Sequence, residues 1–204
     1  MSRFLQGKSG KAQLTPSAPQ GGSAPSERRP SWVKELLEWV KMVAAALVIV
    51  LLLHVFVFNL STVVGHSMEP TLKEREWLFV NKLALRLGKP RLGDIVVLKD
   101  VSTPSGPQSY LVKRVVGVPG DRIEIRSGKL YRNGAPAAEP YTDSDIDDAD
   151  YGPVVVEPGR YFVMGDNRHT GASRDSRSFG TVPGSQIEGR ADLILWPVRQ
   201  LKAL

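Results

Sequence analysis

Two side chains in this sequence have the chemistry of a hydrolytic pair. Ser67 lies in a polar stretch, residues 65–72, that follows a long apolar run ending at Leu60. Lys113 lies within an apolar stretch, residues 110–116. A serine hydroxyl becomes a nucleophile when a neighbouring base takes its proton, and a neutral lysine amine is such a base. Ser67 alone does not predict catalysis, because serines beside turn residues usually close loops or cap helices.

The residues around Lys113 alternate as they do in a β-strand. Leu111, Lys113 and Val115 fall on one face, so the lysine shares its side of the strand with apolar neighbours. Burial disfavours an ammonium ion, and lowering a lysine pKa by about three from about 10.4 corresponds to roughly 4 kcal/mol. The alternative is an edge strand whose lysine reaches water with its tip.

A third polar stretch combines turn residues with charges of both signs. Gly-Asp-Asn-Arg at 165–168 follows a strand-like run, and Ser-Arg-Asp-Ser-Arg stands at 173–177. Turn residues and ion pairs gather at active sites, but they also gather in structural loops. By itself, this stretch leaves both interpretations open.

The composition excludes several kinds of site. The 204 residues include no cysteine, so there are no disulfides, thiolate metal sites or cysteine nucleophile. The three histidines, His54, His66 and His169, are widely spaced and lack carboxylates at metal-ligand spacing. We therefore expect neither a metal nor a cofactor.

The net charge of +6 is concentrated near the N-terminus. Up to Lys41 there are seven basic and three acidic residues, an excess of +4, against +2 for the rest of the chain. These charges are scattered through a segment rich in proline, serine and glycine, without the interleaved aromatics of a nucleic-acid-binding patch. We expect no nucleic-acid partner.

The N-terminal part of the chain predicts a membrane anchor. Residues 1–30 are rich in glycine and proline and predict a flexible tail. Apolar residues at helical spacing follow in residues 31–41, and residues 42–60 are apolar except for His54 and Asn59. At about 1.5 Å per helical residue, the second run nearly spans the hydrocarbon core of a bilayer.

The anchor is expected to remain attached to the protein. A cleaved secretory signal would have a shorter basic region and a shorter apolar region than this one. We therefore predict an interfacial turn and a single transmembrane signal-anchor helix over residues 31–60. The preceding basic residues predict a cytoplasmic N-terminus, with residues 61–204 on the outer face of the membrane.

Beyond the membrane, the sequence predicts a mainly antiparallel β domain. Short runs rich in β-branched and aromatic residues alternate with glycine and proline, and only residues 81–87 have a helical pattern. An acidic run at 143–150 lacks the glycine and glutamate of a calcium loop and predicts a solvated loop. The expected strands are 77–80, 94–98, 110–118, 122–125, 129–131, 154–156, 161–164 and 191–195.

Several of these stretches together resemble one family. Residues 67–72, 93–96, 112–121 and 165–177 stand in the order and spacing of the motifs of bacterial type I signal peptidases, and an anchor precedes them. The resemblance covers the chain from about residue 42 to its end. It implies a fold of antiparallel β type with a small inserted β cap, here in reduced form at about residues 122–159.

The resemblance also implies an activity. Proteins of this family are Ser-Lys proteases, without a cofactor, that remove signal peptides from secreted preproteins at the outer face of the cytoplasmic membrane. Ser67 would be the nucleophile, and Lys113 would take its proton and donate it to the leaving amine. The Ser67 backbone N–H would bind the oxyanion, and shallow apolar pockets would select small substrate side chains. The expected partners are preproteins and membrane lipid, and the expected state is a monomer.

The family's supporting residues can be carried over by position. Ser173 corresponds to the serine that orients the lysine, although the stretch between Arg168 and Ser173 is longer than in many relatives, which leaves Ser176 as the alternative. Asp175 and Arg177 would form an ion pair that shapes the site. The remaining supporting residues flank the nucleophile: Met68, and Gly65, where some relatives carry a hydroxyl residue that contacts the oxyanion.

Other functions remain open at this point. A histidine-based hydrolase could combine Ser67 with His66 or His169 and with Asp166, but no strand-turn-helix elbow surrounds Ser67. A self-cleaving repressor would share the serine and lysine, but it would need a DNA-binding helix pair where this chain has an apolar span. A membrane-anchored β domain that only binds extended peptides would not need Lys113.

Three aromatic residues of the β domain raise a separate question. Trp77, Phe79 and Trp196 lie in or beside predicted strands. They belong either to the core or to a surface that rests on lipid, since Trp is enriched at membrane interfaces.

Overall fold

The computed structural model describes residues 31–100 and 109–204. The flexible tail expected over residues 1–30 lies outside the described residues. Beyond one long apolar helix at its start, the described chain is mainly β, and its strands pair in antiparallel sheets, as the sequence predicted.

That helix, α1 (Ser31–Phe56), ends earlier than the apolar run. Within it, residues Trp32–His54 are long and apolar enough to cross a membrane, the only such span among the described residues. The expectation of a helix up to Leu60 was wrong, because Phe58–Thr62 form strand β1 instead. Backbone pairing with β2 (Trp77–Asn81) and a ring contact between Phe58 and Phe79, with centroids 5.3 Å apart, stabilise the extended form.

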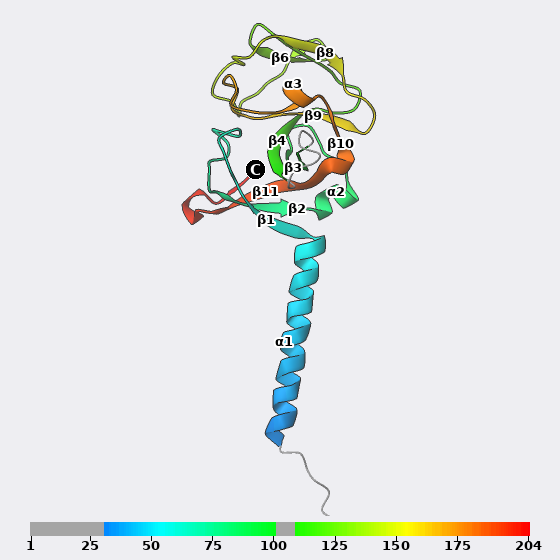
Figure 1. The fold of residues 1–204 in the computed structure, drawn as a ribbon, viewed down its shortest axis with the longest axis vertical. Helices are drawn as coiled ribbons and strands as arrows, with labels where there is room; N and C mark the ends of the chain where they lie inside the picture. The colour runs from blue at the N-terminus through cyan, green and yellow to red at the C-terminus, as the bar shows by residue number, and fades with distance from the viewer. Residues whose placement is uncertain (1–30, 101–108) are drawn as a thin grey trace, which may run out of the picture. The chain divides into compact units, whose positions relative to one another are not determined.

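The larger sheet carries the candidate site. Its strands follow the order β1-β2-β11-β3-β4-β9-β10, β12 pairs with β11, and every pair is antiparallel. Neighbouring strands are therefore often far apart in sequence (Figure 1). The remaining bounds are β3 (Ile95–Lys99), β4 (Tyr110–Gly117), β9 (Arg160–Met164), β10 (Val182–Pro183), β11 (Ile187–Trp196) and β12 (Lys202–Ala203).

A second sheet is formed by residues between β4 and β9. Its order is β7-β6-β5-β8, with β5 (Arg122–Arg126), β6 (Lys129–Arg132), β7 (Ala135–Pro136) and β8 (Tyr151–Val155). The predicted turn at Asn133 and Gly134 joins β6 to β7, and both residues have positive φ, 58° and 83°. Such a turn is accessible to asparagine and glycine at low cost.

Helices are short in the β domain. The helix expected at 81–87 is α2 (Leu83–Leu87), and α3 (Ser176–Phe179) follows β9. Two 3₁₀ turns, Gly184–Gln186 and Val198–Gln200, flank β11.

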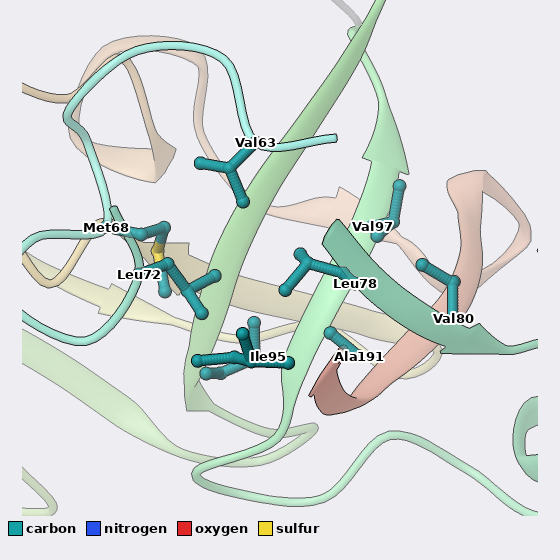
Figure 2. Close-up of a cluster of buried hydrophobic side chains, with 9 residues drawn as sticks. Val63, Met68, Leu72, Leu78, Val80, Ile95, Val97 and Ala191 are labelled. Atoms are coloured by element: carbon teal, nitrogen blue, oxygen red, sulfur yellow. The ribbon is translucent and has the colours of Figure 1, made fainter. Parts of the chain in front are cut away.

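Three buried apolar clusters hold these elements together. One lies under the segment that carries Ser67: Figure 2 shows Val63, Met68 and Leu72 of that segment beside Leu78 of β2 and Ile95 of β3. A second joins Phe162 and Met164 of β9 to the inner face of the second sheet, and a third fills the other side of the larger sheet. The larger sheet is thus covered by apolar side chains on both faces.

Candidate active site

Ser67 and Lys113 meet at the surface of the larger sheet. The Lys113 Nζ atom lies 2.7 Å from the Ser67 Oγ atom and donates a hydrogen bond to it. Lys113 comes from β4, whereas Ser67 comes from the connection between β1 and β2. In that connection, Met68 and Leu72 are 1% and 0% exposed, so their burial fixes the serine next to the strand.

The Lys113 amine is buried, which makes its neutral form easier to reach than that of an exposed lysine. Lys113 is 2% exposed, so the alternative in which the tip of the lysine reaches water was wrong. Burial lowers the pKa of the Lys113 amine from 10.5 to about 8, a change that the nearby Asp175 carboxylate opposes and the Arg174 guanidinium reinforces. The difference corresponds to about 3 kcal/mol against the ammonium form. The Val112 carbonyl oxygen accepts the second hydrogen bond of Nζ, at 2.8 Å.

The residues that follow β9 hold the segment that carries Ser67. The Asn167 backbone N–H donates to the Ser67 carbonyl at 3.1 Å, and the Asn167 side-chain amide donates to the His66 carbonyl at 3.1 Å. A Cβ atom at Gly165 would lie 2.3 Å from the Ser67 carbonyl oxygen, so only glycine permits this approach. The Gly-Asp-Asn-Arg stretch therefore positions the serine through its backbone.

Asp166 and Arg114 form a buried pair next to these contacts. Arg114 donates from Nε and Nη2 to the two oxygens of the Asp166 carboxylate at 2.8 and 2.6 Å. The Thr71 hydroxyl donates to the same carboxylate at 2.5 Å, and Arg114 Nη1 donates to the Gly93 carbonyl at 2.8 Å. This network ties β4, β9 and the Ser67 segment together. Sequence reasoning missed it, although Arg114 is adjacent to Lys113 and Asp166 stands in a motif already singled out.

Asp175 and Arg177 form the expected ion pair beside the site. Arg177 donates from Nε and Nη2 to the Asp175 oxygens at 2.8 and 2.7 Å. Asp175 also accepts the Gly165 backbone N–H at 3.1 Å and caps α3 by accepting from the Arg177 backbone N–H at 3.2 Å. Burial alone would raise the pKa of the Asp175 carboxyl, but Arg177 and the Gly165 N–H outweigh it and hold that pKa below its ordinary value.

The two candidate orienting serines occupy different places. The Ser173 oxygen is buried near the Asp175 carboxylate and helps to lower its pKa, but no described residue gives it a hydrogen bond of normal geometry. The Ser176 hydroxyl oxygen accepts the Val163 backbone N–H at 2.9 Å. Within the described residues, neither serine is hydrogen-bonded to Lys113.

The histidines lie outside this arrangement. The His66 ring contacts the Glu69 carboxylate at 2.9 Å, and the His169 ring contacts that of Asp147 at 2.8 Å. Asp166, the carboxylate that a histidine-based hydrolase would use, is bound to Arg114 instead. Gly65 has a φ of +84°, a conformation that disfavours a side chain with a hydroxyl there.

Comparison with known proteins identifies the family. Residues 36–196 match the family described as signal peptidase, peptidase S26. This chain belongs to the signal peptidase family. The match takes in α1 from Leu36 onward, the larger sheet up to Trp196 and the whole second sheet.

Individual signal peptidases are similar over most of the chain. Signal peptidase I S of Bacillus subtilis is 38% identical over 180 residues, covering 83% of this chain and 94% of its own. Signal peptidase IB of Staphylococcus aureus is 35% identical over 186 residues, covering 83% and 94%. The crystal structure of a signal peptidase I from Enterococcus faecalis is 30% identical, with a TM-score of 0.41, and covers 50% of this chain and 97% of its own.

Proposed function

We propose that this protein is a membrane-anchored serine endopeptidase that removes N-terminal signal peptides from secreted preproteins by means of a Ser67-Lys113 dyad. The 2.7 Å hydrogen bond between the Lys113 amine and the Ser67 hydroxyl carries the proposal. Membership of the signal peptidase family supports the substrate class.

The chemistry follows from the two side chains. Neutral Lys113 takes the Ser67 proton while the serine oxygen attacks the scissile carbonyl, and the resulting ammonium then protonates the leaving amine. Water, deprotonated by the same lysine, hydrolyses the acyl-enzyme and releases Ser67. The Ser67 backbone N–H makes no hydrogen bond to another described residue, so it remains available to bind the oxyanion. Gly65 offers no side-chain donor for a second contact.

The surroundings of the dyad support binding of an extended peptide with small side chains. β9 pairs with β4 from Arg114 onward, so residues 111–113 have a described partner strand on the β3 side alone. An incoming peptide can add as a strand along that free edge. Met68 and Val63 are buried in the apolar cluster beside Ser67, and we propose that this close packing leaves room there for small side chains only.

Three further residues complete the proposed site. Asp175 and Arg177 hold the Gly165 backbone against Ser67 through the Asp175 contact to the Gly165 N–H. We assign the orientation of Lys113 to Ser173 rather than Ser176, because the Ser176 oxygen is committed to the backbone of β9.

The proposal also includes the orientation of the chain in the membrane. The span at Trp32–His54 crosses the cytoplasmic membrane once, with the basic N-terminus inside and the catalytic domain, residues 61–204, on the outer face. The second sheet, within residues 122–159, is the reduced cap of this family. We expect a monomer that contacts lipid and requires neither cofactor nor nucleic acid.

Cleavage of a preprotein tests this function. Purified protein in detergent is expected to cut a preprotein after an Ala-x-Ala site. Ser67→Ala and Lys113→Ala should each abolish cleavage, with near-ultraviolet circular dichroism unchanged. Full cleavage by either variant would refute the dyad. No cleavage by the parent, combined with binding of the preprotein, would instead support the alternative of a peptide-binding β domain without catalysis.

A further inference from the structure

An acidic loop of the second sheet lies against the candidate site. This loop, residues 143–150, connects β7 to β8 and carries five aspartates. Its contacts with the stretch after β9 are concentrated at Asp147 and Asp148. The sequence predicted only a solvated loop there.

Asp147 fastens the loop to the chain just beyond Asn167. Its backbone N–H donates to the Arg168 carbonyl at 3.1 Å, and its carboxylate lies 2.8 Å from the His169 ring. The Thr170 hydroxyl donates to the Asp147 carbonyl at 3.3 Å. His169 and Thr170 belong to the stretch between Arg168 and Ser173, so that stretch helps to hold the loop in place.

Asp148 reaches further, to the ion pair of the site. Arg177 Nη1 donates to the Asp148 carboxylate at 2.6 Å, while Nε and Nη2 of the same guanidinium hold Asp175. The Arg177 side chain is 9% exposed and that of Asp148 is 30% exposed. The guanidinium is therefore held by two carboxylates, one at the start of α3 and one in the acidic loop.

We propose that Asp148 is a positioning residue for peptide-bond cleavage, acting through Arg177 and Asp175 on the backbone that holds Ser67. Asp148 holds Arg177, Arg177 holds Asp175, and Asp175 accepts the N–H of Gly165, whose backbone packs against the Ser67 carbonyl. This proposal rests on the proposed function.

Arg177 borders a cavity, so the Asp148 carboxylate is needed to keep the guanidinium in its position. A cavity of about 420 Å³ is lined by Asp148, Ser173 and Arg177, together with parts of the acidic loop. Without the Asp148 charge, the guanidinium is free to turn into this cavity. Once Arg177 loses its contact with Asp148, it holds Asp175 less firmly. The position of the Ser67 hydroxyl is then less well defined.

Asparagine at position 148 tests the proposal. Asp148→Asn keeps the size of the side chain but removes its charge, and Asp148→Glu restores a carboxylate. Asp143→Asn is the matched control, because the Asp143 side chain is exposed and makes no hydrogen bond or ion pair with another described residue. Steady-state cleavage of an Ala-x-Ala preprotein by the full chain in detergent gives kcat and KM, and thermal unfolding gives stability.

Asp148→Asn is expected to lower kcat about tenfold, the effect of a barrier higher by about 1.4 kcal/mol, with KM within about twofold of the parent. Asp148→Glu should recover most of that loss, and Asp143→Asn should match the parent. An unchanged kcat in Asp148→Asn overturns the proposal, as does an equal loss in Asp143→Asn or a loss confined to KM. A parent that does not cleave overturns the proposed function, and this proposal with it.

Discussion

Replacing Gly165 by alanine tests the packing that presents the nucleophile. An added Cβ would lie 2.3 Å from the Ser67 carbonyl oxygen and 2.4 Å from the Ser173 hydroxyl oxygen. Ordinary contacts of a Cβ atom begin at 3.4 Å. Because the nearest atom belongs to the backbone, it cannot rotate away, and the Ser67 segment must move by about 1 Å.

The expected loss has two parts. Overpacking a close contact costs typically about 1–3 kcal/mol of stability. A displacement of about 1 Å at a reacting atom costs on the order of 100-fold in rate. Gly165→Ala should therefore remain folded at 25 °C while kcat/KM for preprotein cleavage falls about 100-fold.

A control separates activity from stability. Gly159 has a φ of +74° and no atom within 4 Å of an added Cβ, so Gly159→Ala adds backbone strain far from Ser67 in the sequence and without a clash. That strain costs roughly 1–2 kcal/mol, similar to the overpacking term. Gly159→Ala should keep the parental kcat/KM. Parental activity in Gly165→Ala, or equal losses in the two variants, would refute the geometry.

Two further predictions concern the base and the membrane. kcat/KM should rise with pH through about 8, because Lys113 loses its proton there and accepts one from Ser67 only when neutral; a profile flat between pH 6 and 9 would contradict this. Trp77 and Trp196, paired across β2 and β11, are 48% and 56% exposed and should rest on lipid. In a Trp32→Phe, Trp39→Phe background, brominated lipid in vesicles should quench their fluorescence, and undiminished emission would count against the contact.

The strands and the candidate pair of Ser67 and Lys113 were accessible from sequence because each has a local signal. Short runs of β-branched and aromatic residues mark β3, β4 and β9, and the motif around Ser67 stands in order with the strand of Lys113. The alternation argument was incomplete at Lys113, however. From Lys113 onward, every residue of β4 is buried, so burial comes from cover on both faces rather than from one apolar face.

Features that depend on distant partners were not predictable. The helix was expected to run to Leu60, but pairing with β2 turns the last apolar residues into a strand. The ion pair between Arg114 and Asp166 joins residues 52 positions apart, and no periodic pattern in the sequence predicts it. The same holds for Asp148, whose role depends on where the loop folds rather than on its acidic composition.

Cleavage by a Lys113→Met variant tests the central claim most directly. Methionine has nearly the length of lysine and suits a buried site, but it cannot accept a proton. The account predicts no preprotein cleavage by this variant at pH 7 or at pH 9, with the parental melting temperature kept or raised, because the cost of a buried amine is removed. Cleavage at the parental rate at either pH would show that another base activates Ser67.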